Sequence, residues 1–428
     1  MNLTERLREL TLMSASSITI IGTTAIAAGL PKMGRQFAHV PHEQYLVSLS
    51  LTLPALSAGL CAPVMGLIVD RFGRKRLFLI ALAAYGAAGC SGFFLANLYA
   101  IMVSRFVLGI AVSGVATCAT VLIADYARRG ALGALMGRQS LFMALGNVLF
   151  VFAGGLLAEA GWRWPFLLYA VGLLLIPGVV FLIDDRGMAA DAAGTVPRPP
   201  VSAPAASAGP VPAAARPAGL ASMGWVYFLL FINMVIYFMV PVHLPFYLAQ
   251  LSGSGSAQAG ALLSSVGLCW AVSSMFYKRL QRRLGFEQIL VLTFGMSALA
   301  NVMLGAADGY ALVIPALALM GVALGLSITN LNTWLFALAP AGAKGRVIGT
   351  RVFFTFIGQF FSPVLTQPLT SKFGFGWSYI AAGCVLAAIV AGSIAHLLTT
   401  ARRARTAGTG EAAHEIEQSG AERRVGTA

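Results

Sequence analysis

The sequence is short of charge and of cysteine. Charged residues make up 10% of its 428 residues, compared with about 25% in a soluble domain, whereas 58% are hydrophobic. The five cysteines show no metal-ligand spacing and stand in apolar segments, where we expect them to pack as small hydrophobic residues. The sequence contains no recognisable nucleophile–base pair, phosphate-binding loop or metal-ligand cluster, so we expect no enzyme activity, no cofactor and no metal.

A mean hydropathy of +0.81 identifies the lipid bilayer as the solvent of this chain. Within lipid the backbone must satisfy its own hydrogen bonds, which leaves helices or a closed barrel. The apolar runs are continuous rather than alternating, so the sequence predicts an all-α membrane protein with twelve transmembrane helices. The predicted spans are residues 11–31, 45–67, 77–96, 99–124, 138–158, 164–183, 223–249, 257–278, 288–307, 310–337, 347–371 and 377–399.

The net charge of +14 would suit a nucleic-acid partner, but the distribution of the charge excludes one. If the N-terminus is cytoplasmic, 24 of the 29 Lys and Arg residues fall in cytoplasmic loops and termini. Only four fall on the opposite side, namely Lys32, Arg35, Arg163 and Lys372. This asymmetry follows the positive-inside rule, so both termini are expected in the cytoplasm.

Residues 186–222 are rich in Ala, Pro, Gly and Ser, which is typical of a flexible cytoplasmic linker. The linker separates an N-terminal six-helix bundle (1–185) from a C-terminal one (223–400), and residues 401–428 are expected to form a disordered cytoplasmic tail. Glycines recur in the two halves at a constant offset of 212 residues. The pairs are Gly73 and Gly285, Gly109 and Gly321, Gly137 and Gly349, and Gly146 and Gly358. This pattern predicts two pseudo-symmetric bundles.

The loop between the second and third spans reads Gly-Leu-Ile-Val-Asp-Arg-Phe-Gly-Arg-Lys-Arg over residues 66–76. A Gly-x-x-x-Asp-Arg-x-Gly-Arg-Lys string at this place resembles the loop signature of the major facilitator superfamily of secondary transporters. The resemblance covers the chain except for the linker and the tail. It implies two six-helix bundles that rock about a solute site at the bilayer midplane.

The resemblance also implies a gating latch that joins the halves on the cytoplasmic side and stabilises an outward-open state. Gly66 would let helices approach closely, Gly73 suits a tight turn, and Arg74 would reach an acid at the end of the fourth span. The full set is Gly66, Asp70, Arg71, Gly73, Arg74 and Asp125, with Asp70 expected to face the start of the eleventh span near residues 349–351. The alternative is that these charges only set topology and bind anionic lipid headgroups.

Two buried positions are candidates for proton coupling. Arg105 and Gly109 form the Arg-x-x-x-Gly pattern of the fourth span, whose Arg is tied to coupling in the family; the alternative is an arginine that snorkels to the membrane interface. His243 in the seventh span has a side chain that titrates near neutral pH. Its alternative is a histidine hydrogen-bonded at the interface.

The obvious acidic coupling site is missing, because none of the 15 acidic residues stands in the middle of a span. The coupling group could instead be an acid just outside the apolar region, or transport could be independent of protons. Those acids are Glu43, Asp125 and Glu159.

The fifth span carries part of the antiporter-type glycine pattern of the family. The matching positions are Gly137, Gly146, Gly154 and Gly155. The central Gly-Pro of the pattern is replaced by Phe150 and Val151, which removes an expected kink. By resemblance this pattern favours export.

By the same resemblance the substrate cavity lies between the first, fourth, seventh and tenth spans, with the eleventh beside it. Its candidate polar residues are few and neutral: Thr23, Thr24, Asn233, Tyr237, Asn330, Asn332 and Gln359. Aromatic side chains with sparse hydrogen-bonding groups suit an apolar or amphipathic organic solute. We therefore expect a monomeric exporter of the bacterial inner membrane that exchanges such solutes for protons. The alternative is an importer of a small metabolite or organic anion with Arg105 as counter-ion.

Overall fold

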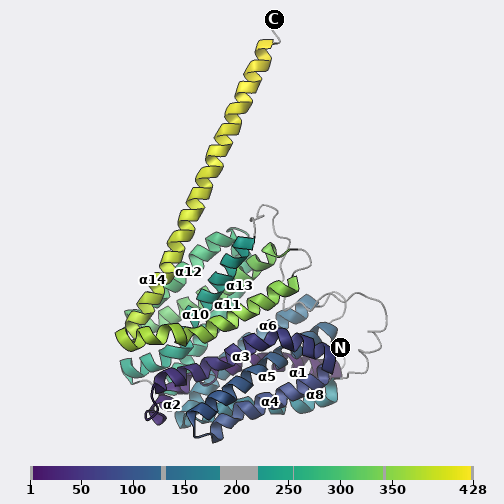
Figure 1. Cartoon of the computed structure of the whole chain (residues 1–428), viewed down its shortest axis with the longest axis vertical. Helices are drawn as coiled ribbons and strands as arrows, with labels where there is room; N and C mark the ends of the chain where they lie inside the picture. The colour runs from purple at the N-terminus through teal and green to yellow at the C-terminus, as the bar shows by residue number, and fades with distance from the viewer. Residues whose placement is uncertain (1–2, 127–131, 184–219, 254, 341–343, 426–428) are drawn as a thin grey trace.

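The structure is a computed structural model that describes residues 3–126, 132–183, 220–253, 255–340 and 344–425, and its regular structure in these ranges is helical throughout (Figure 1). The first half contains α1 (Leu3–Thr24), η1 (Ala27–Gly29), α2 (Leu30–Gln36), α3 (Glu43–Phe72), α4 (Arg74–Phe94), α5 (Leu98–Tyr126), α6 (Leu132–Ala160), η2 (Trp164–Ala170), α7 (Val171–Leu174) and α8 (Ile176–Leu182). The second half contains α10 (Leu220–Ser252), α11 (Ser256–Gln281), α12 (Phe286–Gly305), α13 (Tyr310–Leu338) and α14 (Lys344–Val425). The predicted linker falls mainly on residues 184–219, outside the described residues.

Eleven helical segments of the described residues are long and apolar enough to cross a membrane. The last of them, over residues 346–399, contains two predicted spans, and Gly374 interrupts it with a φ of 82° that a residue with a side chain rarely adopts. The shortest predicted break, at residues 97 and 98, is also present, because α4 ends at Phe94 and α5 begins at Leu98. The prediction of twelve membrane-spanning helices is confirmed.

The two halves repeat the same packing. In the first half α3 and α4 pack on α5, and α1 packs on α6; in the second half α11 and α12 pack on α13, and α10 packs on α14. A Cβ added at Gly109 would collide with the carbonyl oxygen of Pro54, and one added at Gly321 would lie 2.5 Å from that of Val266. Pro54 and Val266 are themselves 212 residues apart, so the sequence repeat reflects two equivalent helix crossings. The prediction of two pseudo-symmetric six-helix bundles is confirmed.

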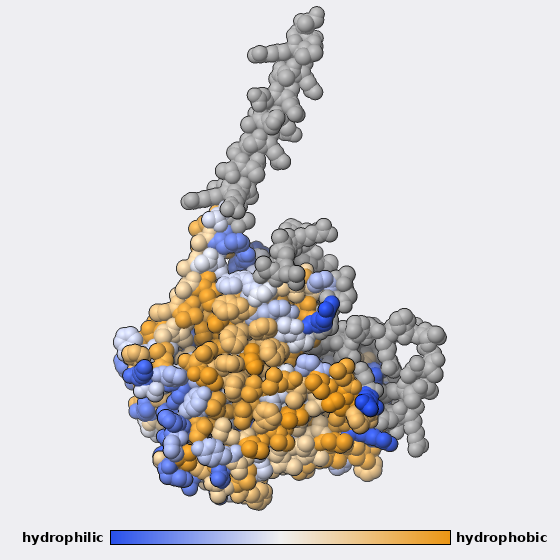
Figure 2. All heavy atoms as spheres, in the orientation of Figure 1, coloured by the Kyte–Doolittle hydropathy of each residue, from blue (hydrophilic) through white to orange (hydrophobic). Residues whose placement is uncertain are grey.

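The halves meet along two helix pairs, α6 with α11 and α3 with α14. Figure 1 shows the first half, in purple and blue, lying against the second half, in teal and green. The outer surface is apolar: Leu67, Phe181 and Met275 have side chains 74%, 82% and 78% exposed. Figure 2 shows that this apolar surface covers the middle of the visible face, with hydrophilic residues gathered toward its two ends. Such a band is what a lipid-facing surface requires.

The chain beyond residue 400 differs from the prediction of a disordered tail. In the structure α14 continues as a helix to Val425 and projects away from the bundles (Figure 1). Residues 401–425 contain six alanines, several Arg and Glu residues and no proline. Helix propensity of this kind can extend an existing helix without a packing partner, because the costly nucleation step has already been made.

Candidate functional site

One end of the molecule carries the predicted latch. Gly73, expected to form a tight turn, connects α3 to α4 with a φ of 84°, a conformation that favours glycine. Arg74, the first residue of α4, forms an ion pair with Asp125 near the end of α5, and the two side chains are only 14% and 22% exposed. The predicted pairing of these residues is therefore present, within the first bundle. The guanidinium carbon of Arg71 lies 5.9 Å from the centre of the Phe72 ring.

At this end the two halves are not in close contact. A Cβ added at Gly66 or at Gly349 would meet no atom within 4 Å. In this conformation Gly66 is therefore not a point of close helix packing. Leu60 and Val64 of α3 are both 51% exposed, on the same helix face as Leu67. The side chain of Asp70, and its predicted contact with the start of the eleventh span, lie outside the described residues.

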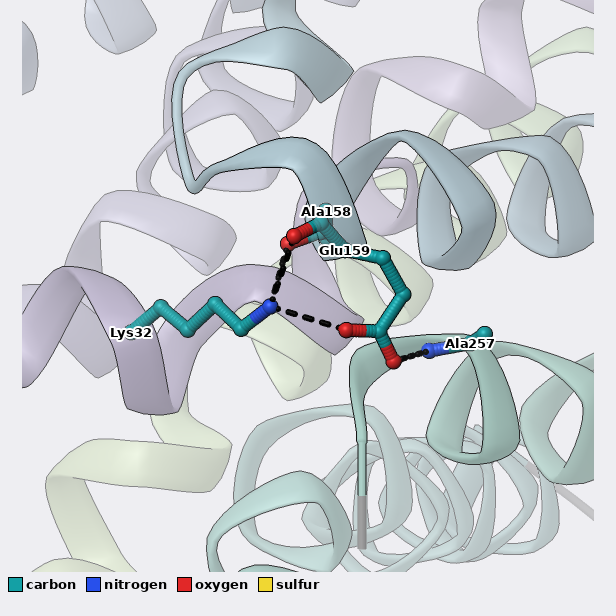
Figure 3. A network of polar contacts seen from close by, with 4 residues as sticks. All are labelled: Lys32, Ala158, Glu159 and Ala257. Atoms are coloured by element: carbon teal, nitrogen blue, oxygen red, sulfur yellow. Dashed lines mark hydrogen bonds and ion pairs between the residues drawn. The ribbon is translucent and has the colours of Figure 1, made fainter.

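At the opposite end a polar network joins the two halves (Figure 3). The carboxylate of Glu159, at the end of α6, accepts a hydrogen bond of 3.0 Å from the backbone N–H of Ala257 in the first turn of α11. The ammonium of Lys32 in α2 lies 2.9 Å from the second carboxylate oxygen and donates to the backbone oxygens of Ala158 and Glu159 at 2.9 and 3.1 Å. Three elements from two bundles thus converge on one carboxylate.

The position of Glu159 has a simple electrostatic reason. The first N–H groups of a helix have no partner within the helix and carry a partial positive charge. The residue that precedes α11 is Gly255, which has no side chain and forms no cap of its own. Glu159 supplies the missing acceptor from the other half, and a Cβ at Gly255 would collide with its carboxylate.

The glycines of α6 explain how the halves approach so closely here. A Cβ added at Gly155 would lie 2.6 Å from the Cα of Gly260 in α11, whereas one added at Gly154 would collide with the backbone oxygen of Ala25. Gly146 packs in the same manner on Ser17 of α1. Gly137, at the opposite end of α6, has no atom within 4 Å of such a Cβ. Three of the four glycines of the antiporter-type pattern are therefore contact positions, and the contact lies at the Glu159 end.

Arg105 is fully buried at 0% exposure, which corrects the alternative of an arginine that snorkels to the interface. One guanidinium nitrogen donates to the backbone oxygens of Ala88 and Gly89 at 3.1 and 2.8 Å. The guanidinium carbon lies 4.7 Å from the ring centre of Phe166 and 4.8 Å from that of Tyr169. These rings and carbonyls hold the side chain between α4 and η2, inside the first bundle. Its coupling role stays a prediction.

His243 is buried at 1% exposure between α10 and α14. Its coupling role and the alternative of a hydrogen-bonded histidine near the membrane interface both stay predictions. Its Nε2 lies 2.7 Å from the hydroxyl of Thr366. That hydroxyl donates its hydrogen to the backbone oxygen of Ser362, so Nε2 carries a hydrogen and donates to Thr366. The second ring nitrogen, Nδ1, is buried with no hydrogen-bond partner among the described residues. A buried nitrogen with a free lone pair could accept a proton only if the site opened to water.

Some of the predicted cavity residues use their polar atoms in hydrogen bonds within the protein, and others keep polar atoms without a partner. Asn330 is engaged at both ends of its amide: it accepts from the Tyr277 hydroxyl at 3.1 Å and donates to the Phe286 backbone oxygen at 2.9 Å. Its assignment to the cavity is therefore corrected, because it ties α11, α12 and α13 together. The hydroxyls of Thr23 and Thr24 donate to the Ile20 backbone oxygen.

Two predicted cavity residues keep buried polar atoms without a partner in the described part of the chain. These are the Asn233 amide nitrogen, whose oxygen accepts from Ser327 at 3.3 Å, and the Gln359 oxygen. Tyr237 and Asn332 are half-buried. The structure has cavities of about 560 and 240 Å³ at helix ends, and neither is lined by the predicted cavity residues.

The sequence does not predict the two partners of Glu159, which belong to other helices. Lys32 is expected only as a charge on the side of the membrane opposite to the termini. Ala257 cannot be identified from its residue type because it donates through its backbone N–H. Gln139 was also missed; its amide donates to Ser16 at 2.9 Å and links α6 to α1. A polar residue inside an apolar span would have been the available signal for Gln139. No group of three or more His, Cys, Asp or Glu side chains that could hold a metal occurs among the described residues.

Comparison with known proteins agrees with this architecture. The chain is 23% identical over 342 residues to the multi-drug resistance efflux pump PmrA of Streptococcus pneumoniae, a match that covers 77% of this chain and 81% of the pump. It is 30% identical over 162 residues to the bacillibactin exporter of Bacillus subtilis, which covers 36% of this chain and 40% of the exporter.

Two solved structures share the fold. A D-xylose–proton symporter superposes with a TM-score of 0.66 at 13% identity, over 88% of this chain and 96% of the symporter. The human organic anion transporter MFSD10 superposes with a TM-score of 0.63 at 18% identity, over 91% and 99% of the two chains.

The family assignment rests on a sequence profile. The profile of the Major Facilitator Superfamily matches residues 12–363 and 254–423, which together span nearly the whole chain. The twelve helices, the two equivalent bundles and the Gly73–Arg74–Asp125 arrangement agree with that match. The chain belongs to the major facilitator superfamily and is a multi-pass membrane transporter rather than an enzyme.

Proposed function

We propose that this transporter is a monomeric, proton-coupled exporter of apolar or amphipathic small organic molecules, located in the bacterial inner membrane with both termini in the cytoplasm. Orientation is supported by the 24 Lys and Arg residues on the side of the termini. On that orientation the Glu159 network lies on the periplasmic side, and the Arg74–Asp125 pair lies on the cytoplasmic side. A structure closed by Glu159 at the periplasmic side, in which a Cβ at Gly66 or Gly349 would meet no atom within 4 Å at the other side, supports an inward-facing state.

The observation that carries the export proposal is the packing of α6. Its glycines contact α1 through Gly146 and α11 through Gly155, and Gly155 lies at the interface between the halves that must separate when the periplasmic end opens. A rigid helix between two partners can transmit the opening of one bundle to the other. The likeness to an efflux pump over 77% of the chain supports the same direction.

The proposed class of solute is inferred from the few polar atoms of the predicted cavity residues that have no hydrogen-bond partner in the described part of the chain. These buried polar atoms are the amide nitrogen of Asn233 and the amide oxygen of Gln359. Tyr237 lies with its ring centre 5.6 Å from that of Phe238, and Phe231 lies 6.1 Å from Phe361. Aromatic walls with two or three hydrogen-bonding groups favour an apolar or amphipathic solute over a sugar.

Glu159 is our candidate for the coupling carboxylate, and His243 is the second. Protonation of Glu159 would remove the negative charge that attracts both Lys32 and the N-terminus of α11, which would weaken the periplasmic closure. The same event would couple proton entry from outside to opening toward the outside. In an antiporter the proton would then be released inward after the cytoplasmic ends of the two bundles had separated again.

The direction of transport can be tested in everted membrane vesicles energised to an acidic interior. Export predicts that a hydrophobic dye cation such as ethidium accumulates in vesicles that contain the protein, and that dissipating the proton gradient with an ionophore releases it. Accumulation of an organic anion by intact cells, without dye movement, would overturn the proposal. The anion importer has little structural support, since Arg105 is enclosed by carbonyls and rings.

A further inference from the structure

The larger cavity of about 560 Å³ lies at the end of α11, on the side of the molecule opposite to Glu159. Its lining combines three arginines with four apolar side chains: Phe276, Arg279, Leu280, Arg282, Arg283, Leu292 and Leu326. The arginines are exposed, and the guanidinium carbon of Arg279 lies 5.6 Å from the ring centre of Phe276. None of the lining residues is acidic.

The arginines of this cavity lack the acidic partners that the equivalent end of the first half provides, and Glu287, at the same end, has its Oε2 3.3 Å from the ring of His396. In the first half the equivalent end holds Arg74 in an ion pair with Asp125. At the offset of 212 residues Asp125 corresponds to Ala337 and Asp70 corresponds to Arg282, so the second half lacks both acids and has gained a cation. The three arginines form no ion pair among the described residues. Three clustered positive charges with no ion pair in the described residues favour the binding of an external anion.

The apolar part of the cavity faces the membrane. Phe276 and Leu292 are 51% and 41% exposed, and they stand at the ends of two membrane-spanning helices. Leu326 and Leu280 form the floor and belong to a small hydrophobic cluster with Tyr277 and Ile289, separate from the main core. The arginines of the cavity thus face water, and its exposed apolar side chains face the hydrocarbon of the membrane.

We infer that this cavity is a binding site for one anionic phospholipid. The phosphate would lie between Arg279, Arg282 and Arg283, and an acyl chain would follow Phe276 and Leu292 along α11 and α12. Arginine binds phosphate through two parallel hydrogen bonds, and basic pockets between helices at the cytoplasmic face suit such headgroups. A freely soluble phosphate would leave the apolar rim without a partner, so the lipid is the occupant that uses the whole cavity. This inference is independent of the direction of transport.

Native mass spectrometry of the full-length protein tests the site. The probes are phosphatidylglycerol and phosphatidylcholine of identical acyl chains, titrated separately. We expect the wild type to retain phosphatidylglycerol at least tenfold more tightly than phosphatidylcholine. The variant Arg279→Gln/Arg282→Gln/Arg283→Gln should lose this preference. The matched control is Arg402→Gln/Arg403→Gln/Arg405→Gln, which removes three charges from the C-terminal segment and should keep it.

Several results would overturn the site. Retention of the preference by the cavity variant would place the lipid elsewhere, and equal loss in the control would reduce the effect to net charge. Complete displacement of phosphatidylglycerol by 10 mM inorganic phosphate, a concentration of the order of 10⁴ times a micromolar Kd, would indicate a small-anion site instead. If the triple variant fails to fold, the exposed single variant Arg282→Gln must still weaken phosphatidylglycerol binding without changing phosphatidylcholine binding.

Discussion

Glu159 of the first bundle caps the first turn of α11 in the second bundle, accepting a 3.0 Å hydrogen bond from the backbone N–H of Ala257. This bond joins residues 98 positions apart in the chain. It occurs where Gly155 and Gly260 allow the two backbones to touch. This contact holds the two halves together at one end of the transporter, and substitution of a single side chain can remove it.

Removing the charge of Glu159 should favour opening at its end. Glu159→Gln keeps a similar shape but loses the ion pair with Lys32 and the charge at the α11 N-terminus. Both are partly exposed, so the combined loss is about 1 kcal/mol, or roughly a fivefold change in the ratio of the two states. Pulsed electron paramagnetic resonance distances between spin labels on α2 and α11 would measure that ratio.

The control for this experiment is Glu43→Gln. It removes the same charge from the first residue of α3, which forms no ion pair among the described residues. The distance distribution should then stay as in the wild type. Equal shifts in the two variants would show that the Glu159 network does not hold this end closed.

A side chain at Gly155 should separate the halves by steric contact. In Gly155→Ala the new Cβ would lie 2.6 Å from the Cα of Gly260, and a backbone atom cannot turn away. We expect a longer α2–α11 distance and slower transport. Gly295→Ala in α12 places the same methyl group in open space and should leave both unchanged. Normal transport by Gly155→Ala would contradict the close contact.

The substitution Arg105→Lys should destabilise the protein. The lysine ammonium could not bond two carbonyl oxygens while stacking on Phe166 and Tyr169. Loss of hydrogen bonds to a buried charged group costs about 1.5–3 kcal/mol. Thermal unfolding of purified Arg105→Lys should therefore occur at a lower temperature than that of the wild type. Wild-type unfolding together with lost transport would instead make Arg105 a coupling residue with no structural role.

The Arg74–Asp125 pair can be tested by exchanging its charges. Arg74→Asp and Asp125→Arg alone should each lower transport, because each leaves a partly buried charge beside a like charge. The double variant should recover part of the loss, with a coupling energy of about 0.5–3 kcal/mol. Additive losses would show that the two residues act independently.

Much of the fold could be predicted because local chemistry determines it. Continuous apolar runs specify the spans, Gly73 specifies a turn, and the repeat of Gly109 at Gly321 specifies equivalent crossings. The helical tail was not predicted because its composition, rich in Ala, Arg and Glu, is compatible with either a helix or a disordered segment.

The candidate site was less predictable because its contacts join distant segments. Lys32 and Glu159 are separated by 127 residues in the chain. The third partner is the backbone N–H of Ala257, and every residue except proline has such a group, so the sequence does not single it out. Asn330 was assigned to the cavity because an asparagine within a span can face either a cavity or a neighbouring helix. In the structure its amide faces Tyr277 of α11 and Phe286 of α12.

The most direct test of alternating access is to lock the closed end. Gly34 of α2 and Phe246 of α10 belong to different halves, and a Cβ added at Gly34 would lie 3.5 Å from the Phe246 ring. In a cysteine-free background, Gly34→Cys and Phe246→Cys would be joined by a short, reducible bis-thiosulfonate linker. The account predicts that the linker abolishes transport and that reduction restores it. An unchanged transport rate in the linked protein would contradict it.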